Sequence, residues 1–145
     1  MPDCSHGEIQ IGGDVPRSLL PALVAHLQDA GLLDEDATWE DLKPNKQGVL
    51  AFEDPDAVGG SFFELEEFLT KSKVDFDRQA SPSYYYEGEA VQVRGGECFT
   101  DSTESTFALR KKFVKLLKMS KEQIAAFVKK NALPPKLKRF RVVDQ

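Results

Sequence analysis

The sequence is short of cysteine and histidine, which limits the sites it can build. It contains two cysteines, Cys4 and Cys98, and two histidines, His6 and His26. A secreted domain of this size that depended on disulfides would usually carry more cysteines, so we expect two thiols in a reducing compartment. Structural zinc sites need closely spaced pairs of ligands. Cys4-x-His6 is not followed by a second pair, and we expect neither a metal nor a cofactor.

Long apolar segments are also missing. No apolar run approaches the roughly 20 residues that a membrane-spanning helix requires. The first seven residues are polar and do not combine a basic region with an apolar stretch, which argues against a signal peptide. These two features predict a cytoplasmic protein that has no membrane partner.

Catalytic motifs are absent as well. The chain has no Gly-x-Ser-x-Gly elbow and no Gly-x-x-x-x-Gly-Lys phosphate loop, and only two histidines could act as a general base. Carboxylates are numerous, but none is distinguished from its neighbours by spacing or context. We therefore assign no catalytic residue and favour a protein that is not an enzyme.

What the sequence does contain is a strong separation of charge. Residues 110–145 hold 12 Lys or Arg against two acids, a net charge of +10, whereas residues 1–109 carry −15. This division predicts an acidic α/β body at 1–103 and a basic helical tail at 104–145, which we expect to form one compact unit. The tail could fold back on the body or meet an anionic partner, and charge alone leaves both open.

Hydrophobic periodicity predicts the order β-α-β-α-β-β-β. The expected strands are 8–11, 48–52, 74–77, 84–86 and 90–93, and the expected helices are 18–31 and 61–72. A Ser61/Glu64 capping box would begin the second helix, and Gly31 would end the first. The expected fold class is α/β (α+β), a mixed sheet with helices packed on it and right-handed crossovers between parallel strands. A basic helical hairpin follows at the C-terminus, with residues 100–105 as a polar linker or a helix start.

Three consecutive tyrosines form the first candidate site. In a strand, Tyr84 and Tyr86 would point to one face and Tyr85 to the other. At least one ring should then face solvent or a partner, and tyrosine is enriched at binding surfaces. With Arg78 upstream, these residues form a hypothetical protein-binding site. The alternative is that the rings pack along the sheet.

The tail offers a second candidate. Residues 113–127 resemble a DNA-binding helix-turn-helix, with Leu117, Met119, Ile124 and Phe127 at the apolar positions of that motif. The resemblance implies that the second helix contacts DNA. It departs from the motif at Lys118, where glycine usually makes the turn, and at Val114, where a small residue is usual. An ordinary amphipathic hairpin packed on the body is the interpretation we favour.

Basic residues could bind nucleic acid without a true helix-turn-helix. The candidate contacts are Lys121, Gln123, Lys129, Lys136, Lys138, Arg139 and Arg141. The acidic body and a pI near 5.1 oppose this function. The leading hypothesis is therefore a non-catalytic binding or regulatory module that contacts a protein partner. Nucleic-acid binding is one alternative, and an enzyme with a small-metabolite cleft at the strand ends is the other. Nothing in the sequence predicts the oligomeric state.

Overall fold

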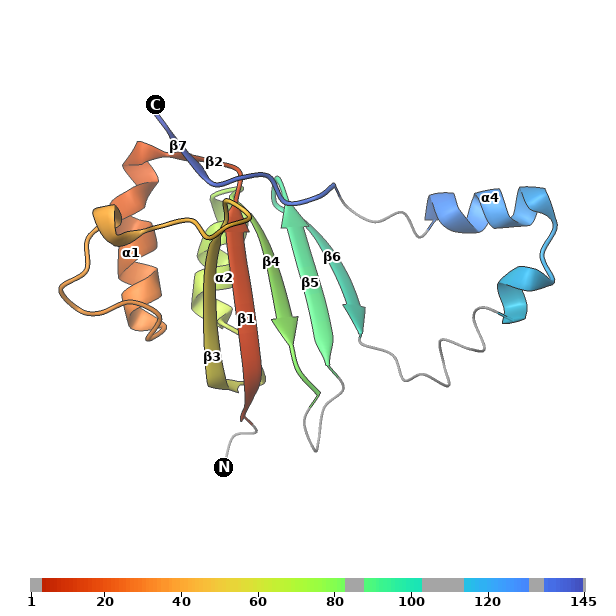
Figure 1. Ribbon diagram of the computed structural model, residues 1–145, viewed down its shortest axis with the longest axis horizontal. Coiled ribbons are helices and arrows are strands. Elements are labelled where there is room, and N and C mark those ends of the chain that lie inside the picture. Colours follow the sequence, from red (N-terminus) through yellow and green to blue (C-terminus); the bar gives the residue numbers. More distant parts are fainter. Residues whose placement is uncertain (1–3, 83–87, 103–113, 131–134, 145) are drawn as a thin grey trace.

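A five-stranded antiparallel sheet forms the centre of the protein (Figure 1). The computed structural model describes residues 4–82, 88–102, 114–130 and 135–144, without the side chains of 100–102 and 127–130. The strands lie in the order β3-β1-β4-β5-β6. Their bounds are Cys4–Gly12 (β1), Leu50–Val58 (β3), Asp75–Ala80 (β4), Glu89–Arg94 (β5) and Glu97–Ser102 (β6).

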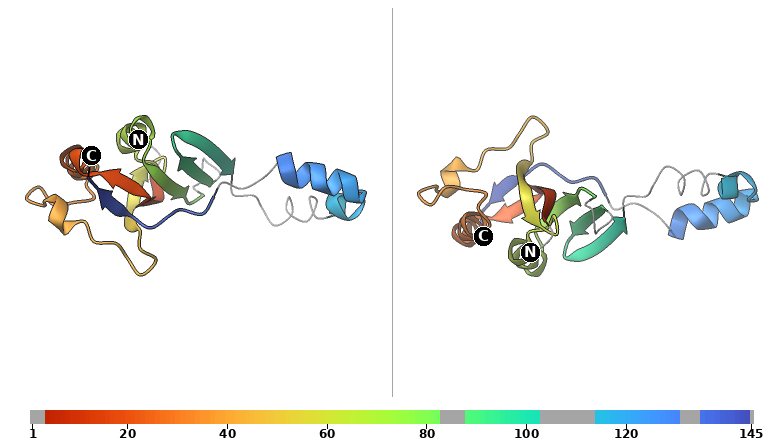
Figure 2. Two further views of the ribbon diagram at one scale, coloured as in Figure 1. Left: turned by 90° about the horizontal axis from the view of Figure 1, so that it is seen from above. Right: turned by 90° about the horizontal axis from the view of Figure 1, so that it is seen from below.

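Two helices cover one face of this sheet. Figure 2 shows α1 (Leu20–Asp29) and α2 (Phe63–Lys71) on the same side. Alternation along each strand sends apolar residues to that side: Ile9 and Ile11 of β1 are fully buried, while Glu8 and Gln10 between them are exposed. The hydrophobic core therefore lies between the helices and the sheet, and the opposite face of the sheet is polar.

The expected combination of helices and strands is confirmed, but the expected parallel neighbours are wrong for the main sheet. Each pairing in that sheet is antiparallel. Within the described residues, the parallel pair joins two short strands that were not expected, β2 (Asp14–Pro16) and β7 (Arg141–Val143). Apolar alternation marks a strand and its buried face, but it carries no information about the direction of the neighbouring strand.

Residues 100–102, which we expected to belong to a polar linker or a helix start, belong instead to strand β6. Residues 97–102 pair with β5 across a two-residue turn at Gly95 and Gly96. Both glycines have positive φ, +59° and +85°, as a type I′ hairpin turn requires. The expected strand 84–86 stays a prediction, because residues 83–87 lie outside the described part of the chain.

Strand β3 continues beyond residue 52, the expected end of this strand, and includes Pro55. The strand reaches Val58, because β3 is an edge strand and a proline there removes no hydrogen bond from the sheet interior. The register between β1 and β3 shifts around His6: Ser5 pairs with Ala57, whereas Gly7 pairs with Asp54. One residue of β1 thus faces two residues of β3, which is the signature of a β-bulge.

The predicted helix ends were correct at some positions and wrong at others. Gly31, with φ +74°, follows Ala30, the C-cap residue of α1, and so stands at the end of this helix as expected. The Ser61/Glu64 box was wrong: α2 begins at Phe63, and the Phe62 amide donates instead to Glu66 Oε2 at 2.7 Å. Phe62, and not Ser61, is the N-cap residue of α2. Its amide is therefore paired with the carboxylate of Glu66 and not with a side chain of the expected box.

The second helix of the tail, α4 (Lys121–Lys130), begins at a capping box, and the Ser-x-x-Gln spacing of Ser120 and Gln123 is typical of that motif. The Ser120 amide donates to Gln123 Oε1 at 2.9 Å, and the Gln123 amide donates to Ser120 Oγ at 3.3 Å. Residues 114–117 are also helical. Residues 103–113 lie outside the described part of the chain, so the helical hairpin stays a prediction.

Residues 135–144, which we call the C-terminal strap, pack on the body. The Gly13 amide donates to Lys138 O at 2.9 Å, and the Phe140 amide donates to Gly48 O at 2.7 Å. Phe140 and Val142 contact the edge of the hydrophobic core. Figures 1 and 2 show the strap crossing one end of the sheet on the face opposite the helices, whereas α4 lies apart from the sheet.

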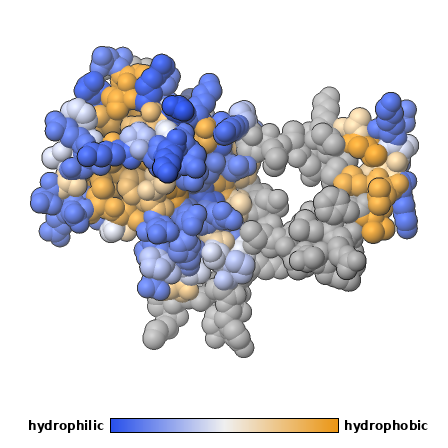
Figure 3. Space-filling model, viewed as in Figure 1, coloured by the Kyte–Doolittle hydropathy of each residue, from blue (hydrophilic) through white to orange (hydrophobic). Residues whose placement is uncertain are grey.

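The described part of the helical tail exposes apolar side chains. Leu117 is 86% exposed, and Val114 and Ile124 are exposed as well. Figure 3 shows hydrophobic surface next to hydrophilic surface in this part of the molecule. None of the helices in the described ranges is long and apolar enough to cross a membrane.

Candidate binding groove

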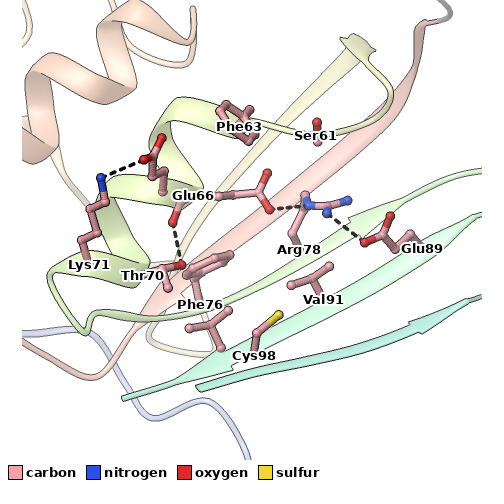
Figure 4. Close-up of a pocket in the computed structure, with 12 residues that line it drawn as sticks. Ser61, Phe63, Glu66, Thr70, Lys71, Phe76, Arg78, Glu89, Val91 and Cys98 are labelled. Carbon is pink, nitrogen blue, oxygen red and sulfur yellow. Dashed lines mark hydrogen bonds and ion pairs between the residues drawn. The ribbon is translucent and has the colours of Figure 1, made fainter. Parts of the chain in front are cut away.

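A cavity of about 440 Å³ lies between α2 and strands β4 to β6, on the helical face of the sheet (Figure 4). Figure 2 shows α2 over the middle of the sheet and β6 beyond it. The end of the sheet at β5 and β6 is therefore covered less than its centre. We call this cavity the α2–β6 groove.

Apolar side chains form much of the α2–β6 groove. Phe76 of β4 and Val91 and Val93 of β5 are buried and line it from the sheet. Phe63, the first residue of α2, lines the opposite side although 75% of it is exposed. Cys98 of β6 marks the outer edge in Figure 4. A large aromatic side chain in solvent next to an apolar cavity is typical of a binding surface.

Arg78 is the buried charge of the groove, with 8% exposure. Its Nε donates to Glu66 Oε1 at 2.6 Å, and its Nη2 donates to Glu89 Oε1 at 3.3 Å. Its Nη1 is buried and has no hydrogen-bond partner. A buried donor without an acceptor costs about 1–3 kcal/mol, and more when it carries charge. The groove therefore contains one strong donor whose hydrogen-bonding capacity is not met.

Glu66 connects this arginine to the start of α2, because its second carboxylate oxygen accepts the Phe62 amide. A second ion pair of α2 lines the groove, where Lys71 Nζ is 2.8 Å from Glu67 Oε1. The hydrogen bond and charge of Lys71 hold the pKa of the Glu67 carboxyl below its ordinary value of 4.5. The lining of the groove contains two cations, Lys71 and Arg78, and three carboxylates. The groove therefore carries one excess negative charge.

The sequence placed one residue of this groove, Arg78, in a candidate site. Tyr84, Tyr85 and Tyr86 lie outside the described residues, so their part in that site stays a prediction. Phe63, Glu66 and Glu89 were missed, because each is an ordinary helix or strand residue in the sequence. These residues come from α2 and β5 and lie close together in the folded protein. No short sequence motif predicts that contact.

The residues proposed for nucleic-acid binding do not form one surface in the described structure. Lys121 and Gln123 lie at the start of α4, away from the sheet, and the side chain of Lys129 is not among those described. Lys136, Lys138, Arg139 and Arg141 belong to the C-terminal strap. Of these, Arg141 is already engaged with Asp14, at 3.0 and 3.1 Å.

The described residues contain one group with metal-ligand geometry, His6, Glu8 and Glu53, whose ligand atoms lie within 4.8 Å of one another. His6 Nε2 is already 3.2 Å from Glu53 Oε2. The group sits on the open polar face, and both glutamates are exposed. His26 takes no part in it and stacks on Phe68 with 4.4 Å between ring centres. Such an exposed group does not by itself indicate a bound ion.

Comparisons with known proteins place the chain in no family. No family model matches the sequence, and neither the curated proteins nor the solved structures include a match to it.

Proposed function

We propose that this protein is a non-catalytic binding module that takes an extended segment of a partner protein along strand β6. The partner's side chains would enter the α2–β6 groove. One observation carries the proposal: a sheet edge borders a partly apolar groove that holds a buried, unmatched hydrogen-bond donor.

Strand β6 is an edge of the main sheet as described. Among the described strands, β6 pairs with β5 alone. Arg94 and Glu97 flank the two-residue turn and form a hydrogen-bonded pair in such a hairpin. Alternation then directs the backbone groups of Thr100 away from β5. An incoming strand would pair with these groups, as in other complexes in which a peptide extends a sheet.

The α2–β6 groove lies beside this edge. A strand beside β6 would direct alternate side chains toward α2. The apolar surface of Phe63, Phe76 and Val91 suits an apolar side chain. The unmatched Nη1 of Arg78 needs an acceptor, and the excess negative charge around it favours a neutral carbonyl oxygen over a carboxylate. An uncharged, extended peptide segment satisfies both requirements.

A substitution at Thr100 tests the proposal. Thr100→Pro removes an outward N–H without removing a bond to β5, and Thr100→Val is the matched control, because it keeps that N–H. Random-sequence peptides displayed on phage would be selected against the wild-type protein and then titrated by NMR. We expect shifts of β6 and α2 amides, a loss of affinity of at least about tenfold in Thr100→Pro, and little loss in Thr100→Val.

Selected peptides that shift other surfaces, or that bind Thr100→Pro as tightly as wild type, would contradict the proposal. The enzyme alternative depended on a cleft at the ends of parallel strands. Strand-end crevices of the expected kind belong to parallel sheets, and the main sheet is antiparallel.

A further inference from the structure

A second cavity, of about 630 Å³, lies on the opposite face of the sheet, where the C-terminal strap crosses it. We call it the strap cavity. Polar side chains line it from both the sheet and the strap, among them Gln10, Gln92, Arg94, Lys136, Lys138 and Arg139. Its volume falls in the range of small-molecule sites.

The strap cavity is basic, although the body around it is acidic. Four cations line it, from β5 and the strap, against one carboxylate, Asp77. No ion pair within the described ranges holds Lys136, Lys138 or Arg139, whereas the neighbouring Arg141 is bound to Asp14. Three strap cations are thus available to an anionic ligand.

The backbone of the strap places these cations. The Gly13 amide binds Lys138 O, and the Phe140 amide binds Gly48 O. Close contact supports these bonds, because a Cβ atom on Gly48 would lie 2.7 Å from Arg139 Cγ. The three cations therefore extend from a segment that is fixed before any ligand binds, which lowers the entropy cost of binding.

Arg94 joins the strap to the sheet beneath the cavity. Its side chain is 10% exposed, its Nε donates to Pro135 O at 2.8 Å, and its Nη1 lies 2.7 Å from Asp77 Oδ1. That oxygen has no hydrogen bond of good geometry, so the contact is one of charge. Nη2 of Arg94 is buried without a partner. Asp77 thus offsets one of the four positive charges, and a donor of Arg94 remains unmatched.

We propose that the strap cavity binds the phosphate group of a nucleotide or of a nucleic-acid strand. Lysine and arginine are the usual phosphate ligands. The amides of Gln10 and Gln92 can hydrogen-bond a sugar or a base edge. Phe99, the cross-strand neighbour of Gln92, lies on the same face and offers a ring on which a base can stack. The site is independent of the α2–β6 groove.

The test uses three probes on the full chain: pyrophosphate, ADP and a fluorescein-labelled single-stranded RNA. NMR titration should shift the side-chain amide signals of Gln10 and Gln92. The variant Lys136→Ala/Lys138→Ala/Arg139→Ala should bind at least about tenfold more weakly. The control Lys115→Ala/Lys118→Ala/Lys121→Ala also removes three exposed cations, but from the helical tail, and should retain affinity within about twofold.

The probes also distinguish the source of the phosphate. Equal affinity for ADP and RNA would assign a free nucleotide, and much tighter, salt-sensitive RNA binding would assign a strand; both support the site. Equal weakening in the two triple variants would show general attraction to positive charge and would overturn the proposal. Weakening confined to the tail variant, or no binding of any probe, would overturn it as well.

Discussion

Arg141 holds Asp14 with two hydrogen bonds, from Nε to Oδ1 at 3.0 Å and from Nη2 to Oδ2 at 3.1 Å. The two residues are 127 positions apart in the chain and directly opposite each other in the β2–β7 pair. The hydrogen bonds to Asp14 and its charge raise the pKa of Arg141 above its ordinary value. This clamp anchors the end of the strap next to the strap cavity.

Exchanging the two charges should preserve the clamp, whereas reversing one should open it. Asp14→Arg or Arg141→Asp alone places like charges opposite each other, and we expect faster hydrogen exchange at the Phe140 amide. The double variant restores an opposite pair and should recover much of the protection. Exchange as fast in the double variant as in the single ones would contradict this role of the pair.

Gly12 should tolerate no side chain, because the strap passes directly over it. A Cβ atom there would overlap the carbonyl oxygen of Lys138 and lie 2.8 Å from Leu137 Cγ. Gly12→Ala should displace the strap and cost about 1–3 kcal/mol of stability. The control is Gly59→Ala, where a Cβ meets nothing within 4 Å. Its positive φ adds local strain, but the Phe140 amide should keep its protection from exchange.

The buried ion pair of the α2–β6 groove should show strong coupling. Arg78→Met leaves the Glu66 carboxylate largely buried without its cation, and we expect a loss of about 3 kcal/mol in urea unfolding. Adding Glu66→Gln removes that charge and keeps an oxygen for the Phe62 amide, so the double variant should be more stable than Arg78→Met by about 1 kcal/mol or more. A double variant no more stable than Arg78→Met would show that the pair is not coupled.

Lys73 should be a site where glycine stabilises the fold. Lys73 has φ +57°, and the Val74 amide donates to Leu69 O at 2.9 Å, which is the Schellman pattern at the end of α2. Lys73→Gly removes the strain of a left-handed residue with a side chain, so stability should rise by about 0.5–1 kcal/mol in thermal or urea unfolding. The control Lys71→Gly, at the last residue of α2, should lower stability by a similar amount. A loss of stability in Lys73→Gly would refute the strain argument.

The sequence by itself determined the local elements of this protein. Alternation at Ile9 and Ile11 identified a strand and its buried face, Gly31 marked the end of a helix, and Ser120 with Gln123 marked the start of another. These features depend on residues at most a few positions apart, where backbone geometry and side-chain chemistry act directly.

Only the tertiary structure decided which distant segments meet. The sequence identified the basic residues of the strap but not the polar sheet face that they contact, and it identified Arg78 but not the groove around it. β6 was missed because its polar residues belong to an edge strand, which is recognised by its pairing with β5. Strand direction, the docking of the strap and both cavities depend on contacts across many residues. Local periodicity does not predict such contacts, because they form between residues that are far apart in the sequence and become neighbours only on folding.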